Sequence, residues 1–311
     1  MKKENIELFY DYFDLIANLL YTNYGKTYLE GMNEAFNLLL DGELEAKYND
    51  EDLLEMNKAK DLIVEVSFQP EEVRKSVQLG LLKGYKHTYS SNALITPDTI
   101  GIFMGYLIKK LYINRPLKTI MDPLIGTGNL VYSIVNYLDQ SIKVFGVDHD
   151  LVKCNIARNL GDLLDVENEV FFQETQTYFD DGFDLIVTDM PIVLSDKNYL
   201  PYQVINHHFS SLNPGGYFLS LIDNDFFDKT NSNVFREEIQ KQGYIFGLVK
   251  LSETLFKTNP KSILILRKKG ENVTQNKDFL MVDLPSFNDL EEFNRIINQI
   301  DKWMLDREED L

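Results

Sequence analysis

The fold of this chain is decided by Thr119-Ile-Met-Asp-Pro-Leu-Ile-Gly-Thr-Gly-Asn-Leu130. The segment begins as an apolar strand and passes through Gly126 and Gly128 into a stretch with helical spacing. Glycine lets a backbone approach a ligand where a Cβ atom would clash. A third glycine at the spacing of a pyrophosphate-binding loop is missing, which argues against a dinucleotide clamp. The segment predicts a strand, a ligand-binding turn and a helix, the alternative being an ordinary glycine turn.

The region from about residue 117 alternates short β-branched runs with helical stretches, the pattern of parallel strands joined by crossover helices. Strands are expected at 118–122, 142–147, 170–173, 184–189, 217–222, 245–251 and 262–268. Helices are expected at 128–138, 150–163, 199–212 and 233–242. The last two strands are too close in sequence for an intervening helix, so they predict an antiparallel hairpin. A doubly wound sheet of seven strands with this ending is the architecture of class I S-adenosylmethionine-dependent methyltransferases.

The remaining residues predict a second domain and a short extension. Residues 1–84 carry apolar side chains at three- and four-residue spacing, which predicts a small helical domain with two or three helices. Its aromatic stripe from Phe9 to Phe13 is expected to form core or a homodimer seam, the alternative being a docking surface. Residues 85–311 are expected to form the α/β domain, with the tail from 271 as a last strand and helix.

Charge and composition limit the class of protein. The chain of 311 residues has a formal net charge of −18, which argues against a nonspecific binder of nucleic acid because such binding depends on Lys and Arg. Most of the excess of acidic residues is in the two flanks. Residues 1–84 carry 9 basic and 17 acidic side chains, and residues 271–311 carry 4 basic and 11 acidic side chains. The middle can therefore still present a basic face. One cysteine, Cys154, and no apolar run long enough for a membrane span predict a cytoplasmic protein without a membrane partner.

Acidic residues follow three of the expected strands. Asp122 ends the first strand, where a carboxylate can meet a ligand's ammonium group, as a methionine moiety would provide. Asp148 ends the second strand, 22 residues after Gly126, and can accept hydrogen bonds from both ribose hydroxyls of an adenosine. Glu174 follows the third strand and can bind the adenine amino group or be a solvated loop residue. Together these positions predict an S-adenosylmethionine site.

The motifs Asp122-Pro-x-x-Gly-Thr-Gly128, Asp148 and Asp189-x-Pro191 resemble those of the N6-adenine DNA methyltransferases. The resemblance is to the modification-subunit type of type I restriction systems and their short bacterial relatives, and it covers roughly residues 85–270. Asn92-Ala-Leu-Ile-Thr-Pro-Asp-Thr-Ile100 resembles the family's threonine-proline motif, which implies that Thr96 lies over the cofactor. The stretch from Lys250 to Lys269 resembles the family's terminal hairpin.

The resemblance also implies a methyl-acceptor site. In the family, an Asn/Asp-Pro-Pro-aromatic loop accepts the amino hydrogens of a flipped adenine and stacks on its ring. This implies catalytic roles for Asp189 and Pro191, but Met190 replaces the first proline and Ile192 the aromatic residue. Tyr199 and Tyr202 are expected to pack their own helix, the alternative being that one of them stacks on the base.

Three functional hypotheses follow. The first is a methyltransferase acting on N6 of adenine, with DNA favoured over RNA and with sequence recognition left to a partner subunit, because no region resembles a target-recognition domain. The second is an RNA or protein methyltransferase. The third is a non-catalytic S-adenosylmethionine-binding scaffold whose acceptor loop has degenerated. No metal site is expected, since His207 and His208 are adjacent and point apart on a helix.

Overall fold

The computed structural model describes residues 1–42, 44, 48–87, 95–193, 198–256, 259–271, 273 and 278–306. The chain divides into two compact units. One consists of Met1–Ile102 with Ile125–Gln173, and the other of Phe103–Leu124 with Glu174–Leu311.

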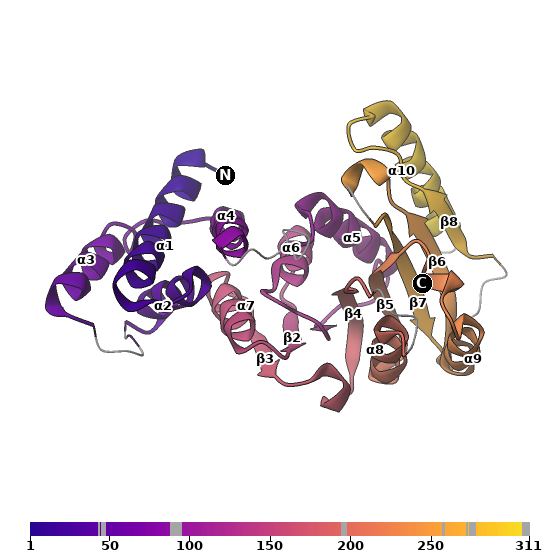
Figure 1. Ribbon diagram of the computed structural model, residues 1–311. Coiled ribbons are helices and arrows are strands. Elements are labelled where there is room, and N and C mark those ends of the chain that lie inside the picture. The colour runs from indigo at the N-terminus through magenta and orange to yellow at the C-terminus, as the bar shows by residue number, and fades with distance from the viewer. Residues whose placement is uncertain are drawn as a thin grey trace. The chain divides into compact units, whose positions relative to one another are not determined.

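Eight strands form one mixed sheet in the order β3-β2-β1-β4-β5-β7-β6-β8 (Figure 1). The strands are β1 (Thr119–Asp122), β2 (Lys143–Asp148), β3 (Asn168–Phe172), β4 (Phe183–Asp189), β5 (Leu212–Asp223), β6 (Gly243–Lys250), β7 (Lys261–Lys268) and β8 (Leu280–Asp283). The prediction of seven strands in the sheet was wrong by one, because the strand of the tail, β8, pairs in parallel with β6. This pairing satisfies backbone groups that would otherwise remain open along an edge strand.

Ten α-helices are assigned in the described residues. They are α1 (Lys3–Tyr24), α2 (Tyr28–Leu40), α3 (Asp50–Asp61), α4 (Pro70–His87), α5 (Asp98–Leu111), α6 (Asn129–Leu138), α7 (Leu151–Leu163), α8 (Leu200–Phe209), α9 (Ser232–Gln242) and α10 (Leu290–Leu305). The expected crossover helices are present as α6 to α9. The N-terminal region holds four helices, one more than the upper limit of the prediction, since α3 and α4 follow the two whose apolar spacing is clearest in the sequence.

The first unit begins with helices that bury a continuous apolar core. The side chains of Phe9, Phe13, Ile16 and Leu20 on α1 are all buried, so the aromatic stripe forms core as predicted. Helices α1 and α2 pack so closely that a Cβ atom on Gly31 would lie 2.7 Å from a backbone atom of α1. These helices therefore form a tightly packed layer.

Polar contacts attach this helical layer to the α/β elements of the same unit. Asn159 on α7 donates hydrogen bonds from its amide to the side-chain oxygens of Asn33 and Asn37 on α2, at 2.8 and 2.7 Å. The amide of Asn136 on α6 donates to Glu71 on α4 at 3.1 Å. Directional contacts of this kind fix the register of the helices.

Arg74 on α4 is a deeply buried charged group of the first unit, with 1% of its surface exposed. Its guanidinium forms paired hydrogen bonds of 2.8–2.9 Å with Glu71 and with Asp98 at the start of α5. Burial raises the pKa of both carboxyls, but the guanidinium outweighs this effect and holds each pKa below its ordinary value. Arg74 thus joins two helices through a charge that has no access to water.

The second unit is organised around the antiparallel hairpin. Strand β7 pairs antiparallel with β6, as predicted, and also with β5, while β4 pairs in parallel with both β1 and β5. The central strands β5 and β7 are almost entirely buried. This arrangement brings the carboxyl ends of β4 and β5 to the start of β7.

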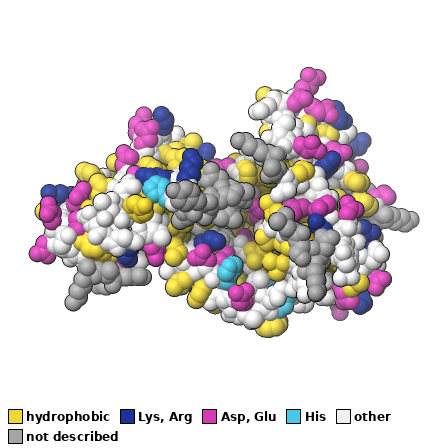
Figure 2. Space-filling model, in the orientation of Figure 1, with side chains coloured by type: hydrophobic (Ala, Val, Ile, Leu, Met, Phe, Trp, Pro, Cys, Tyr) yellow, Lys and Arg dark blue, Asp and Glu magenta, His cyan; other side chains and the backbone are white. Residues whose placement is uncertain are grey.

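The surface carries both signs of charge. Figure 2 shows Asp and Glu side chains over the N-terminal helices and around α10, with Lys and Arg between them. Among the described helices, none is both long and apolar enough to cross a lipid bilayer.

Replacing Arg74 by Met is expected to lower the free energy of unfolding by about 3 kcal/mol, because it leaves two carboxylates without their buried partner. Lys75→Met is the matched control, since Lys75 lies on the same helix and is more exposed. Its ion pair with Glu71 is longer, with 3.7 Å between the nitrogen and the oxygen. Lys75→Met should cost less than about 1 kcal/mol. Urea unfolding measures both values, and equal losses would contradict the role given to Arg74.

Candidate active site

The glycine turn follows β1 in the chain and leads into α6. Gly126 and Gly128 have φ values of 53° and 79°, in the left-handed region that glycine adopts without strain. A Cβ atom on Gly128 would collide with the ring of Tyr132 at 2.4 Å, whereas one on Gly126 would meet nothing within 4 Å. Gly128 is therefore required for packing, and Gly126 faces space that a ligand can enter.

Asp148 lies beside this turn. Its carboxylate, in a residue 8% exposed, accepts hydrogen bonds from the backbone N–H of Gly126 at 3.0 Å and of Asp150 at 2.9 Å. A carboxylate has about four acceptor sites, so two remain for hydroxyl donors. Asp150 caps α7 by accepting from two backbone N–H groups, as its position predicts. Asp148 is thus fixed by the backbone and still able to bind a ligand.

Two further residues of the first unit contact this region. The buried Thr96 accepts, through its carbonyl oxygen, a hydrogen bond of 2.8 Å from Asn129 at the start of α6, so the threonine-proline segment meets the helix that follows the turn. Asn92 of that motif lies outside the described residues. Tyr85 on α4 was not identified from the sequence, because its apolar neighbours indicate a core position. Burial raises the pKa of its hydroxyl to about 12, and a hydrogen bond with Thr127 opposes this effect.

The predicted residues of the second unit lie at strand ends. Asp122 and Asp189 end the adjacent parallel strands β1 and β4, and Asp122 is buried and accepts a hydrogen bond of 3.0 Å from the N–H of Leu124. Glu174 begins a short 3₁₀ helix, Thr175–Thr177, and is exposed. Because Met121 pairs with Ile186, Asp189 lies two residues further along its strand than the position level with Asp122. Glu174 is open to solvent.

The loop after Asp189 differs from the Asn/Asp-Pro-Pro-aromatic loop of the N6-adenine DNA methyltransferases, which the sequence resembles. Met190 is buried and donates its N–H to Leu221, whereas Pro191 is exposed and Ile192 is 43% exposed. Tyr199 and Tyr202 are buried in an aromatic cluster around Phe226, which confirms that they pack their own helix. No tyrosine of this pair is available to replace the missing aromatic residue of the loop.

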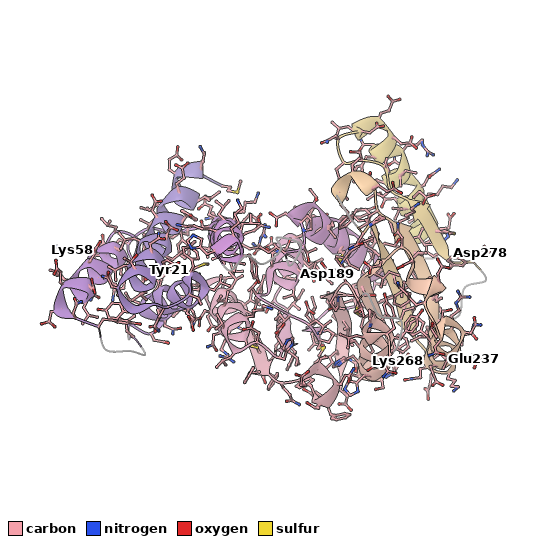
Figure 3. All side chains as sticks on the ribbon, viewed as in Figure 1. Tyr21, Lys58, Asp189, Glu237, Lys268 and Asp278 are labelled. Atoms are coloured by element: carbon pink, nitrogen blue, oxygen red, sulfur yellow. The ribbon has the colours of Figure 1, made fainter. Side chains whose placement is uncertain are left out.

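Lys261, at the start of β7, is the main residue of the second unit that the sequence analysis missed. Its ammonium group pairs with the Asp189 carboxylate and donates a hydrogen bond of 3.0 Å to the carbonyl oxygen of Met190. The residue is only 7% exposed. A lysine at the start of an apolar strand is normally a solvated end, so the sequence carries no signal for this contact. Figure 3 labels Asp189 at the end of β4.

Asp223 belongs to the same cluster, because it is the cross-strand neighbour of Lys261 on β5. Burial raises the pKa of its carboxyl, the nearby charges of Asp225 and Asp189 raise it further, and Lys261 and Lys229 oppose them. The ends of β4, β5 and β7 therefore form a partly buried cluster of two carboxylates and one ammonium group.

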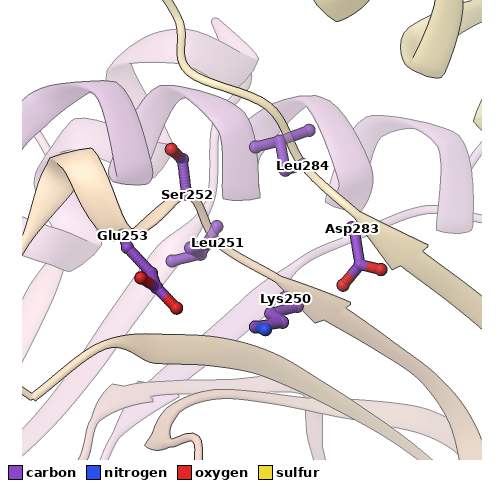
Figure 4. A pocket seen from close by; sticks show the side chains of 6 residues that line it. All are labelled: Lys250, Leu251, Ser252, Glu253, Asp283 and Leu284. Carbon is purple, nitrogen blue, oxygen red and sulfur yellow. The ribbon is translucent and has the colours of Figure 1, made fainter.

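Two pockets adjoin the end of β6, and Lys250 and Asp283 line both of them. One, of about 170 Å³, is lined by Lys250, Leu251, Ser252, Glu253, Asp283 and Leu284 (Figure 4). The other, of about 220 Å³, includes Asn224 and Ser262, whose side chains are hydrogen-bonded at 2.7 Å.

The two adjacent histidines have structural contacts. His208 is buried, and its Nε2 lies 2.8 Å from the hydroxyl of Thr175. Burial lowers the pKa of His208 to about 3, so its ring is neutral at pH 7. In the described ranges, no three His, Cys, Asp or Glu side chains are grouped closely enough to hold a metal ion.

Comparisons with known proteins connect this geometry to one fold. A model of the YtxK N-terminal helical domain matches residues 7–85. The uncharacterised protein YtxK of Bacillus subtilis is 28% identical over 256 residues, which are 76% of this chain and 78% of that protein.

Two solved structures extend the comparison. A proposed class I S-adenosylmethionine-dependent methyltransferase from Listeria monocytogenes is 29% identical, with a TM-score of 0.87 over 97% of this chain and 100% of that chain. The modification subunit of a proposed type I restriction enzyme from Vibrio vulnificus is 15% identical, with a TM-score of 0.59 over 85% of this chain and 64% of that chain. The fold is therefore a Rossmann-like methyltransferase fold with a mixed eight-stranded sheet and an N-terminal helical domain.

Asp223→Asn is expected to stabilise the protein at pH 7 and to have little effect near pH 3. The folded-state pKa of this carboxyl lies above its ordinary value of 3.8, so its contribution to stability falls as the pH rises from that value through the folded-state pKa. Thermal unfolding at both pH values measures this difference. Asp225→Asn, which removes an exposed carboxylate two residues away, is the control, and a gain from Asp223→Asn that is the same at both pH values would contradict the assignment.

Proposed function

We propose that this chain binds S-adenosylmethionine and transfers its methyl group to an exocyclic amino group, with N6 of adenine in DNA as the favoured acceptor. One observation carries this proposal: a carboxylate oxygen of Asp189 and the carbonyl oxygen of Met190 converge on a single nitrogen, the Nζ of Lys261. Two acceptors that meet at one nitrogen suit an amino group with two hydrogens. The overall similarity to the Listeria protein supports the choice of cofactor.

The cofactor would be held by residues from several strand ends. We assign its methionine end to Asp122 and to the turn at Gly126 and Gly128, where the backbone leaves room for a ligand. We assign its ribose hydroxyls to Asp148, which retains acceptor capacity beyond its two backbone hydrogen bonds. Glu174 would accept from the adenine amino group, and Thr96 would cover the cofactor, as the sequence resemblance implies.

The chemistry assigned to Asp189 and Met190 is orientation. The bound cofactor supplies an electrophilic methyl group on a sulfonium. The amino nitrogen of adenine is a weak nucleophile, because its lone pair is delocalised into the ring. Two hydrogen bonds from its amino hydrogens to Asp189 and Met190 would direct that lone pair, and alignment of this kind accounts for much of the rate gain in group transfer. On methyl transfer, Asp189 or water would take up the amino proton.

A non-catalytic S-adenosylmethionine-binding scaffold is the second candidate, and the acceptor loop supports it. Ile192 offers no π face to a base, although stacking on an aromatic side chain is worth about 1–3 kcal/mol. An RNA base or a protein amide has the same planar amino group, so both remain alternative acceptors. The net charge of −18 favours a partner subunit, or a second copy of this chain, as the source of nucleic-acid binding.

Asp148→Ala is expected to weaken S-adenosylmethionine binding about 10- to 100-fold, which corresponds to the 1.5–3 kcal/mol of a hydrogen bond to a charged group. Isothermal titration calorimetry measures the affinity. Asp150→Ala is the control, because it removes a carboxylate from the same loop whose role is to cap α7. It should lower the free energy of unfolding by about 1 kcal/mol and leave the affinity for S-adenosylmethionine unchanged. Equal weakening by both variants would remove the ribose assignment.

Transfer of a labelled methyl group to DNA, RNA and protein acceptors in parallel tests the acceptor class. We expect labelled DNA, with N6-methyladenine as the product after nuclease digestion, and at least a 100-fold loss of transfer in Asp189→Ala with cofactor binding retained. Label in another acceptor would select one of the alternatives. If the cofactor binds and no acceptor is labelled, even with Ile192→Tyr, the scaffold becomes the preferred function.

A further inference from the structure

We propose that Lys261 is an internal competitor for the methyl acceptor: its ammonium group occupies the two oxygens that would orient a substrate amino group. This inference rests on the proposed function, because it assigns the acceptor position to Asp189 and Met190. It adds a residue that controls access to that position.

The geometry places the lysine in the acceptor position itself. Lys261 starts β7, which pairs with β5, and β5 in turn pairs with β4. Its side chain therefore crosses the end of β5 to reach Asp189 at the end of β4. Its Nζ makes contacts with both a side-chain and a backbone acceptor there. A substrate nitrogen that uses the same two oxygens cannot bind while Nζ remains.

The burial of this group makes the contact specific. Lys261 is 7% exposed, and an ammonium group is costly to bury unless charged and polar partners compensate for the lost water. Asp189 and Met190 provide this compensation, and the side chain of Asp189 is itself only 24% exposed. The lysine is thus held firmly in the resting protein, and an acceptor must replace its hydrogen bonds in order to enter.

Lys261 is a competitor and not itself the methyl acceptor. Lys261 forms an ion pair with Asp189, and an ammonium group has three donors and no lone pair. Methylation requires a neutral nitrogen to attack the methyl carbon. The lysine therefore blocks transfer in the position where the structure holds it, and selects for acceptors that can displace a cation from Asp189.

Adenosine and purine riboside, which lacks the exocyclic amino group, are suitable probes. Each is titrated calorimetrically into protein saturated with S-adenosylhomocysteine. We expect Lys261→Met to bind adenosine at least tenfold more tightly than the wild type does, with no gain for purine riboside. Lys229→Met is the matched control, because it removes a nearby lysine that pairs with Asp225 at 2.7 Å, and it should behave as the wild type.

A second variant separates a folding defect from a failed proposal. Lys261→Met leaves Asp189 without its ion pair, so the double variant Asp189→Asn with Lys261→Met removes both charges and keeps a side-chain oxygen as acceptor. Thermal unfolding identifies the variant that is folded. Unchanged adenosine affinity, or no binding, in a folded variant overturns the proposal. A one-methyl mass gain on wild-type Lys261 after incubation with S-adenosylmethionine also overturns it, since the lysine would then be an acceptor.

The failure of this proposal can be distinguished from the failure of the proposed function. Titration of S-adenosylhomocysteine into the wild-type protein comes first, and absence of binding contradicts the cofactor assignment. In that case the adenosine and purine riboside titrations of Lys261→Met and of the wild type are carried out without S-adenosylhomocysteine. A gain for adenosine without a gain for purine riboside would then support the competing role even if the cofactor were a different molecule.

Discussion

The contact of the Lys261 ammonium group with Asp189 and the carbonyl oxygen of Met190 is the interaction on which the second unit's functional end depends. It connects the end of β4 to the start of β7 and fixes the backbone of the loop that follows Asp189. Because the ammonium is buried, neither partner can be removed without leaving a charge or a carbonyl unsatisfied. The contact that stabilises the loop thus also occupies the Asp189 and Met190 oxygens that would bind an acceptor amino group. Stability of the loop and access to the acceptor position are therefore coupled.

The first unit is organised differently, by backbone hydrogen bonds that leave room for a ligand. The turn at Gly126 donates its N–H to Asp148, so the carboxylate is oriented before any ligand arrives. A preorganised carboxylate avoids part of the entropy cost that a mobile side chain would add to binding. Within this short motif, Gly126 faces open space that a ligand can enter, whereas Gly128 packs against Tyr132. This half of the candidate site is therefore ready for a ligand, whereas the acceptor loop is occupied by the chain itself.

This difference determines what the sequence could predict. The strands, the glycine turn and the acidic residues at strand ends were identifiable because each is a local pattern, and the cap at Asp150 was predicted for the same reason. Lys261 and Tyr85 were not, since their roles depend on contacts with residues far away in sequence: Lys261 reaches Asp189 across 72 residues through the register of β5 and β7. The eighth strand was missed as a member of the sheet because β8 has four residues and only one is buried, so its partner is specified by the free edge of β6. Periodicity predicts which residues form an element, but not which distant side chain meets it.

The altered acceptor loop and the buried Lys261 both weaken the binding of an isolated base. A base at this loop would have Ile192 beside it in place of an aromatic ring, and it would have to displace the Lys261 ammonium before its amino group could bind. Each requirement lowers the affinity of the free acceptor, and the acidic flanks lower the affinity of any nucleic acid that carries it. It follows from the proposed function that binding energy from elsewhere must drive the exchange at Asp189. A partner that binds both this chain and the acceptor would supply it by raising the local concentration of the amino group. In such an assembly Lys261 would prevent transfer to stray amines, and the partner would decide which acceptor is methylated.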